Sequence, residues 1–445
     1  MIEVLKHPAY ARLFAAQVIA LIGTGLLTVG LGLLAYDLAG DRAGAVLGTV
    51  FAIKMIAYVG LAPVANALAG RWPRKRVLIG ADIIRALVAL MLPFIDAVWQ
   101  VYCLVFALQA ASATFTPAFQ ATIPDILSDE RDYTRALSLS RLAYDLENLL
   151  SPALAGLLLL FISYHGLFGG TVVGFLGSAL LVLSAAVPAA GSKTKSRPFL
   201  DRLTRGIRIY AATPRLRGLF SLNFSAAAAG AFVLVNTVVV VRGDYGAGDS
   251  EVAMALAAFG GGSMLAALVL PRLLDRIADR SVMLAAGFLL AGLTLAHAVY
   301  QMTQGLPGWS GFLLVWALSG VFYSAILTPS GRLLRNSAHA EDRPALFAAQ
   351  FTLSHLGWLI TYPVAGWAGS ALGLPVAMAI LGTMALAGAV LAVLLWPADD
   401  ALVVEHEHRD LPTDHPHLRE HPAKGARHRH VFVIDDEHRA WPTHG

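Results

Sequence analysis

Long apolar runs recur along this chain almost without interruption, and they constrain its fold more than any other feature. Runs of about 18 or more residues with few charges are typical of helices that cross a membrane. Only 14% of the 445 residues are Asp, Glu, Lys or Arg, too few to solvate the surface of a soluble protein of this length. The first run is not a cleaved signal peptide, because it lacks a small-residue cleavage site and a second run follows at once. We therefore expect an all-α membrane protein.

The sequence predicts twelve membrane-spanning helices. Their expected bounds are 12–38, 45–69, 77–97, 98–123, 137–163, 167–188, 217–241, 251–271, 281–301, 310–334, 345–371 and 374–396. Only Asp96 and Trp99 mark the turn at the 97/98 junction. The single cysteine, Cys103, excludes a disulfide framework and a thiolate metal cluster.

Positive residues are distributed very unequally among the connections. If the N-terminus is cytoplasmic, the loops on that side hold 22 Lys and Arg residues, against only Arg42 and Arg242 on the other side. This bias predicts a multi-pass protein of the plasma (inner) membrane with both termini cytoplasmic. The basic connection 189–217 has apolar residues at helical spacing over 199–210, which predicts a short helix on the inner leaflet. An unstructured linker is the alternative.

The two halves of the chain echo each other at three places. TPAFQATIPDIL from Thr116 resembles TPSGRLLRNSAH from Thr328, SPALAG from Ser151 resembles YPVAG from Tyr362, and GRWPRKRVL from Gly70 resembles DRIADRSVM from Asp275. Such a repeat indicates a duplicated six-helix unit with the substrate site between the halves. We expect a first half at 1–188, a basic cytoplasmic linker at 189–216, a second half at 217–396 and a tail at 397–445.

This layout resembles the major facilitator superfamily. Residues 66–78, NALAGRWPRKRVL, resemble the signature of its loop between helices two and three, G-x-L-a-D-R-x-G-R-(K/R)-(K/R), although Gly70 stands where the family has Asp. In the family that Asp helps to latch the halves together, and Asp275-Arg276 keeps the pair in the second half. The resemblance implies a twelve-helix major facilitator fold and a gating role for six residues: Arg71, Arg74, Lys75, Arg76, Asp275 and Arg276.

A closer resemblance is to the nickel-resistance exporters of that superfamily. It is carried by RLFAAQVIALIGTGLLTVGLGLLAYDLAG (12–40), IKMIAYVGLAPVA (53–65), FQATIPDIL (119–127), YTRALSLSRLAYDLENLLSP (133–152) and a histidine-rich tail. It implies export of nickel and possibly cobalt, and thus metal resistance.

Motifs of other transport and enzyme classes are absent from the sequence. It contains no G-x-x-x-x-G-K-[ST] loop for ATP, and no H-E-x-x-H, C-x-x-C or G-x-S-x-G motif. We therefore expect no enzymatic activity, no cofactor and no nucleic-acid partner. The chain is expected to act as a monomer in the lipid bilayer, driven by an ion gradient with protons as the coupling ion.

Charges inside apolar spans are costly, about 2.5–3.5 kcal/mol each on insertion scales, and by default suggest function. Asp82 and Arg85 are three residues apart and read best as a local ion pair that braces the basic loop. The fifth span is the richest in such groups: Arg141, Tyr144, Asp145, Glu147 and Asn148. Asp145 and Glu147 differ by about 200° around the helix, so they cannot both face one central site. Either Glu147 faces it with Tyr144 while Arg141 neutralises Asp145, or Asp145 faces it with Asn148.

His355, in the eleventh span, holds the position in the second half that Tyr144 holds in the first. Glu147 and His355 each lie about 15 Å into their spans from the cytoplasmic end. A carboxylate and an imidazole at one level could bind a divalent transition metal or share a proton. A histidine hydrogen-bonded within the bundle is the alternative. Lys54, midway along the second span, pairs with one of the acids or repels the cation toward release.

The tail at 397–445 carries nine of the chain's 14 histidines. Candidate metal ligands there are His406, His408, His415, His417, His421, His428 and His430. Few apolar residues are available to fold this segment, VFVI at 431–434 being the exception, so a disordered tail is expected. It would act as a low-affinity metal sponge or sensor, unless its histidines are incidental to a solvated tail.

The favoured hypothesis is a secondary-active antiporter that exports nickel, and then cobalt, against protons. The alternative is a proton-coupled exporter of an organic compound such as a drug or a siderophore, which the apolar bulk of the spans supports. A third possibility is a metal-sensing membrane protein, but a sensor needs neither duplicated halves nor charges inside its spans.

Overall fold

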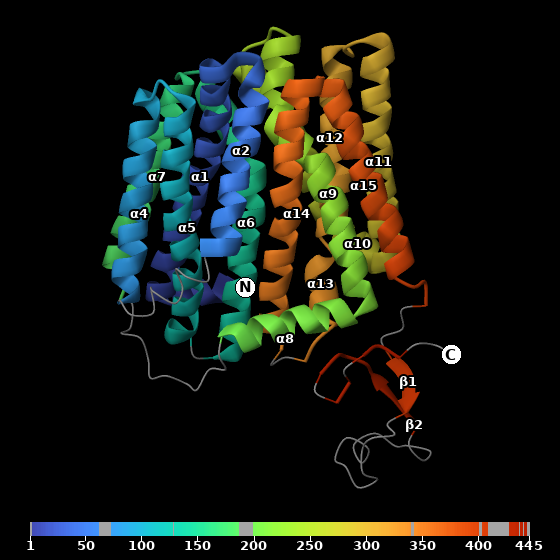
Figure 1. The fold of residues 1–445 in the computed structure, drawn as a ribbon. Helices are drawn as coiled ribbons and strands as arrows, with labels where there is room; N and C mark the ends of the chain where they lie inside the picture. The colour runs from blue at the N-terminus through green and yellow to red at the C-terminus, as the bar shows by residue number, and fades with distance from the viewer. Residues whose placement is uncertain are drawn as a thin grey trace.

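The computed structural model describes residues 2–61, 73–127, 129–186, 199–339, 342–399, 403–407, 427–435, 437–438 and 440–442. Within these residues, long helices form a bundle, and a shorter helix, α8 (Phe199–Ala212), runs across the end at which both chain termini lie (Figure 1). We name this end the tail end and the opposite one the far end.

The first half of the bundle holds six long helices. They are α1 (Pro8–Ala39), α2 (Ala43–Ile56), α4 (Arg74–Met91), α5 (Val98–Ile126), α6 (Glu130–Leu159) and α7 (Tyr164–Ser184). Short turns flank them: η1 (Ile2–Lys6), η2 (Gly40–Arg42), the π-helical turn η3 (Ala57–Leu61) and η4 (Leu92–Phe94). The turn at the 97/98 junction is held by the Gln100 side chain, which accepts hydrogen bonds from the backbone N–H groups of Asp96 and Ala97.

The second half holds six more long helices. They are α9 (Pro214–Val239), α10 (Asp249–Leu274), α11 (Asp279–Gln304), α12 (Trp309–Leu327), α14 (Arg343–Leu372) and α15 (Leu374–Leu395), with the π-helical turn η5 (Val240–Asp244) and the short helix α13 (Ser330–Arg335) between them. Gly373 separates α14 from α15 with a φ of 90°, a conformation that L side chains rarely adopt. The predicted twelve-helix fold is confirmed.

Nine stretches of the described chain are apolar and long enough to cross a membrane, and the first of them, Pro8–Gly60, covers both α1 and α2. Two of the twelve long helices, α6 and α14, are not among these stretches. These are also helices that pack across the boundary between the halves, α6 against α10 and α14 against α2. Both long helices that are missing from the apolar stretches therefore contact the opposite half.

Each half packs mainly within itself. In the first half α7 packs on α1 and α4, and in the second half α9 packs on α15 and α14, so that Figure 1 shows two groups of helices side by side. The separation into two six-helix halves follows from these contacts. The exact domain bounds given above stay a prediction.

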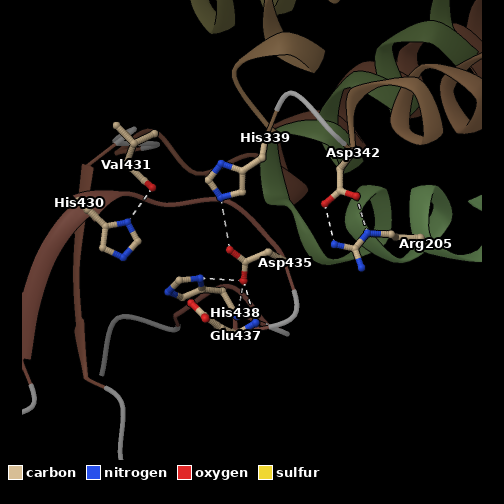
Figure 2. Close-up of polar contacts among 8 residues, drawn as sticks. All are labelled: Arg205, His339, Asp342, His430, Val431, Asp435, Glu437 and His438. Atoms are coloured by element: carbon tan, nitrogen blue, oxygen red, sulfur yellow. Dashed lines mark hydrogen bonds and ion pairs between the residues drawn. The ribbon is translucent and has the colours of Figure 1, made fainter. Parts of the chain in front are cut away.

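The helix predicted in the basic linker is present as α8, and it packs against α14 and α9. Arg205 of α8 forms an ion pair with Asp342, with 2.5 Å from Nε to Oδ1 and 2.7 Å from Nη2 to Oδ2 (Figure 2). The Tyr210 hydroxyl donates to Gln350 Oε1 at 2.5 Å. The linker helix is therefore fastened to the start of α14.

The described part of the tail departs from the expected disorder. Strand β1 (Val403–Glu407) pairs antiparallel with β2 (Arg427–Val431), and Phe432 and Ile434 bury themselves against the tail end of the second half. Asp435 accepts from the His438 ring at 2.9 Å and lies 3.4 Å from His339 Nε2, in the turn before α14 (Figure 2). The VFVI segment supplies the apolar surface that this docking requires.

Candidate translocation site

The two halves touch most closely where α2 meets α14. A Cβ added to Gly48 would lie 2.6 Å from the Tyr362 carbonyl oxygen, and one added to Gly44 would lie 2.6 Å from Asn236 Oδ1. Asn236 in turn donates to the Ala365 carbonyl at 3.0 Å. Only glycine allows backbones to approach this closely, so the two helices are in direct contact toward the far end.

Nearer the tail end, α2 continues into the π-helical turn η3, and Tyr58 of this turn packs against α14. The Tyr58 ring stands edge-on to the His355 imidazole, 5.5 Å between centroids, and the Lys54 ammonium lies 5.8 Å from the Tyr58 centroid. Glu147 of α6 interacts electrostatically with both Lys54 and Tyr58. Lys54 and His355 therefore lie beside one tyrosine, and Glu147, a third candidate from sequence, interacts electrostatically with Lys54 and with this tyrosine. Single-turn π-helices occur frequently at functional sites.

Aromatic rings extend this cluster across the boundary between the halves. Phe51 lies 4.9 Å from Tyr362, which stacks on Trp358 at 4.8 Å, and Trp358 lies 6.3 Å from Tyr323 of α12. Phe259 of α10 lies 5.5 Å from Tyr323. Rings from α2, α10, α12 and α14 thus form a continuous surface beside the charged groups.

Along the face of α14 that meets α2, the exposed fraction of the side chains rises toward the tail end. Ala365 is fully buried and Tyr362 is 7% exposed, but Phe351, one face of which meets Tyr58, is 44% exposed. His355 is half-buried, and its Nδ1 lies 2.6 Å from the Phe351 carbonyl oxygen. The charged and aromatic cluster is therefore more accessible toward the tail end than toward the far end.

An ion-pair network closes the far end. Arg242, at the end of the second half's first helix, places Nη1 3.2 Å from Asp37 Oδ1 and 2.9 Å from Asp249 Oδ1. Asp37 belongs to the first half and also accepts from the Tyr164 hydroxyl at 2.5 Å, while the guanidinium lies 4.9 Å from the Tyr36 ring centroid. Arg242 therefore connects the two halves. We call this group the far-end latch.

Several candidates from sequence lie outside what the structure describes. The side chains of Arg141, Tyr144, Asp145 and Asn148 are among them, although their backbone belongs to α6. The structure therefore describes the neighbours of Glu147 but not those of Asp145. Which of the two acids faces the central site stays open.

The gating role of the six signature residues stays a prediction, and the structure describes the surroundings of five of them. Arg71 lies outside the described residues; Lys75 donates to the Ala185 carbonyl at 2.9 Å, and Arg74 and Arg76 begin α4. In the second half, Asp275 and Arg276 are exposed, and it is Asp279 that receives the guanidinium of Arg332. The latter pair holds α13 to the start of α11, within one half.

Asp82 and Arg85 form the predicted ion pair, and its contacts with the described residues lie inside the first half; most of the basic loop that it was expected to brace, residues 62–72, lies outside the described residues. Both are buried, Asp82 accepts from the Ser178 hydroxyl at 2.7 Å, and the guanidinium lies 4.3 Å from the Phe115 ring and 4.6 Å from the Phe175 ring. The pair therefore fastens α4 to α5 and α7, inside the first half.

Most of the tail histidines lie outside the part of the chain that the structure describes. His408, His415, His417 and His421 lie outside the described residues, and so do the side chains of His406 and His428, which pair in the strand register. His430 lies against Phe432 and His438. Among the described residues, no group of three or more His, Cys, Asp or Glu side chains could hold a metal ion.

Sequence reasoning missed the far-end latch and the aromatic surface. Asp37 near a helix end, and Arg242 as one of two positive residues on its side, were the available signals for the latch. Their pairing joins positions 205 residues apart, which no local pattern indicates. The aromatic residues sit singly in apolar helices, where packing in the core explains them equally well.

Comparison with known proteins agrees with this architecture. The family model described as Major Facilitator Superfamily matches residues 13–240 and again residues 218–434. The uncharacterized MFS-type transporter YfiS of Bacillus subtilis (strain 168) is 24% identical over 382 residues, 84% of this chain and 89% of that protein. Macrolide efflux protein A of Streptococcus pyogenes is 23% identical over 335 residues, 72% of this chain and 80% of that protein.

Solved transporters share the fold at lower identity. A D-xylose-proton symporter superposes with a TM-score of 0.68 at 12% identity, covering 89% of this chain and 99% of its own. A bacterial homolog of the human lysosomal transporter Spinster, in an inward-facing and unoccupied conformation, gives a TM-score of 0.66 at 14% identity, covering 87% and 96%. The chain belongs to the major facilitator superfamily and is a multi-pass secondary transporter, not an enzyme.

Proposed function

We propose that this transporter exports an amphipathic organic compound from the cytoplasm in exchange for protons. One observation supports the proposal: Lys54, His355 and a continuous row of aromatic rings from both halves lie where α2 packs on α14, and Glu147 of α6 interacts electrostatically with Lys54. This was the alternative drug-exporter hypothesis from sequence, and it now takes precedence over nickel.

The aromatic surface suits an organic substrate better than a hydrated metal ion. Flat rings offer large apolar area and bind organic cations through their faces, whereas a metal ion needs several convergent nitrogen or oxygen ligands. Tyr323, Trp358 and Phe259 are half-buried, so part of each ring is available for contact. A relative named for macrolide efflux supports the same class of substrate.

Glu147 is the group we assign to proton exchange at this site. Its carboxylate interacts electrostatically with the Lys54 ammonium, and a proton or a cationic substrate can compete for the same negative charge. Substrate and proton then exclude one another, which is the requirement for antiport. Asp145 is the second acid of α6 and the alternative carrier.

The direction follows from topology and accessibility together. The positive residues of the connections gather at the tail end, which we therefore place in the cytoplasm, with the protein as a monomer in the plasma (inner) membrane. The cluster is exposed toward that end and closed toward the far end by the latch. This corresponds to an inward-facing state that would load substrate from the cytoplasm.

Uptake into inverted membrane vesicles tests the proposal. With erythromycin as the probe and an imposed proton gradient, the wild-type protein should accumulate the compound, and Glu147→Gln should abolish accumulation. Trp358→Ala should weaken uptake, whereas Trp99→Ala, which removes a 65% exposed tryptophan from α5, should leave it unchanged. Equal loss in both tryptophan variants, or no proton-dependent uptake of this or related macrolides, would rule the organic substrate out.

Nickel or cobalt export is the second candidate, and the proximity of His355 and Glu147 to Tyr58 favours it. In that case the carboxylate and the imidazole hold the ion until protonation displaces it, and the tail histidines raise its local concentration. The same vesicles decide: accumulation of radioactive nickel, lost in His355→Ala and unaffected by Trp358→Ala, would establish the metal in place of the organic compound.

A further inference from the structure

Asn223 of α9 is a buried polar residue whose side-chain amide makes no hydrogen bond within the described part of the chain. It is 6% exposed, and neither its Nδ2 nor its Oδ1 has a partner there. A buried amide without partners loses the hydrogen bonds that it made with water, so nearly all buried polar groups in native proteins are paired. An apolar side chain of similar shape would fill the same space without this cost. The amide therefore needs a partner from outside the folded chain.

The position of Asn223 on α9 connects it with the aromatic surface. Gly230 follows seven residues later, which is two turns of helix, so both residues lie on one face and about 10 Å apart along the axis. A Cβ added to Gly230 would lie 2.9 Å from Trp358 Cη2 and 3.2 Å from Tyr323 Cε2. The face of α9 that carries Asn223 therefore meets two rings of the aromatic surface directly.

On this face of α9, only small side chains separate Asn223 from the rings. Ala226 and Ala227 are the residues of the face between Asn223 and Gly230, and both are buried. A Cβ added to Gly357 of α14 would lie 3.7 Å from the Ala227 methyl carbon, so α14 packs closely on this stretch. Because α9 begins beside α8 at the tail end, the amide lies between that end and the rings (Figure 1). A compound that lies on the rings can therefore extend toward the amide on the side from which it enters.

An amide and a row of rings complement the two parts of an amphipathic molecule. The Asn223 side chain offers two N–H donors and a carbonyl acceptor, which suit a neutral hydroxyl or carbonyl group. We propose that Asn223 is a specificity-determining residue of the export site, which binds such a group of the substrate while Trp358 and Tyr323 contact its apolar part. The proposal rests on the organic export proposed above and names the chemistry that selects the compound. A site of this kind rejects analogues without the polar group, because the buried amide then stays unpaired.

Cysteine reactivity tests access to this position independently of the substrate. In a Cys103→Ser background, Asn223→Cys should react with N-ethylmaleimide in the purified protein, and erythromycin should slow the reaction. Ser225→Cys is the matched control: Ser225 is fully buried and its hydroxyl has no partner among the described residues, but its Cβ would lie 3.1 Å from a Cβ added to Gly388 of α15. Since Ser225 faces α15 and not the rings, this variant should stay unreactive.

Asn223→Leu separates recognition from folding. Without any compound it should melt at the wild-type temperature or higher, because it removes an unpaired amide. In vesicles it should raise the half-saturating concentration of erythromycin by about 2–10-fold, the loss of one neutral hydrogen bond, at unchanged maximal uptake.

Three results would overturn the proposal: a lower melting temperature of Asn223→Leu, a half-saturating concentration equal to that of the wild type, or an Asn223→Cys variant as unreactive as Ser225→Cys. The fate of the substrate assignment is read separately. A stable Asn223→Leu and a reactive Asn223→Cys, together with no macrolide uptake by the wild type, would reject the proposed substrate and still support a ligand contact at Asn223.

Discussion

Tyr58 of the first half and His355 of the second meet edge-on, with 5.5 Å between their ring centroids, and the half-buried Lys54 lies 5.8 Å from the Tyr58 ring. Phe351 packs on His355 at 4.0 Å, so the imidazole is held between two rings from opposite halves. Because the two rings belong to different halves, rocking of the halves must change this contact. This contact is therefore a reporter of the transport cycle as well as part of the site.

Replacing Tyr58 tests whether its ring or its hydroxyl matters. Tyr58→Phe keeps the ring contacts and should retain most transport, whereas Tyr58→Ala should lose it, because aromatic pairs of this kind are worth about 0.5–1.5 kcal/mol beyond their buried area. Vesicle uptake and the melting temperature in detergent measure the two effects. A Phe variant as inactive as the Ala variant would assign the role to the hydroxyl.

Lys54 and Glu147 should behave as a coupled pair. Glu147→Gln leaves the Lys54 ammonium without its acidic neighbour inside the membrane, where a charge costs about 2.5–3.5 kcal/mol on insertion scales. We expect the single variants to melt at clearly lower temperatures, and Lys54→Met combined with Glu147→Gln to recover most of the loss. Losses that simply add in the double variant would show that the two charges do not interact.

Gly48 should control closure of the far end. A leucine at this position would clash with the Tyr362 backbone and force α2 away from α14, at a cost of about 1–3 kcal/mol typical of overpacking. Gly48→Leu should therefore lengthen the distance between spin labels attached to cysteines at the exposed positions Ser163 and Gln304, which lie in different halves, in a Cys103→Ser background. Gly32→Leu is the matched control, because a side chain there would meet open space. Unchanged label distances in Gly48→Leu would mean that α2 and α14 can pack together at the far end without a glycine at this position.

The helices could be predicted from sequence because each depends on local signals. Apolar length sets the spans, and Gly373 and the Asp96–Trp99 turn mark junctions that the structure reproduces. The membrane also demands that each span satisfy its own backbone hydrogen bonds, which leaves the helix as the only choice for such runs.

Contacts between distant residues could not be predicted in the same way. Glu147 and His355 were placed at a common level by their distance along each helix, but Tyr58, which contacts His355, was not foreseen. Arg242 and Asp37 meet only because two halves close at one end, and one sequence carries no signal for that state. The docked tail likewise needs a complementary surface on α9 and α13 that forms only after the bundle folds.

The buried pair Asp82–Arg85 should matter for stability rather than for transport. Asp82→Ala would leave the Arg85 guanidinium between Phe115 and Phe175 without a counter-charge, a change that typically costs about 3–5 kcal/mol. Ser178→Ala removes one neutral donor to the carboxylate and should cost about 1 kcal/mol. Melting temperatures in detergent rank the two variants. The ranking would be contradicted if Ser178→Ala were as damaging as Asp82→Ala, or if folded Asp82→Ala lost uptake at unchanged stability.

Docking of the tail hairpin should survive moderate acid. Burial alone would raise the pKa of Asp435, but hydrogen bonds from the ring and backbone N–H of His438 and from the Glu437 N–H outweigh it and lower the pKa below its usual range. A carboxylate whose pKa is depressed in the folded form stabilises that form above its unfolded pKa of about 3.9, and loses this effect only as the pH falls further. The contribution of Asp435 is therefore constant between about pH 8 and pH 5.

A spin label at the exposed Ala440 position, as Ala440→Cys in the Cys103→Ser background, reports whether the hairpin is docked. The label should stay immobile down to about pH 4, and Asp435→Ala should free it already at neutral pH, while Glu405→Gln on the exposed strand should not. Release of the wild-type hairpin near pH 6 would show that a group other than the Asp435 carboxylate controls docking.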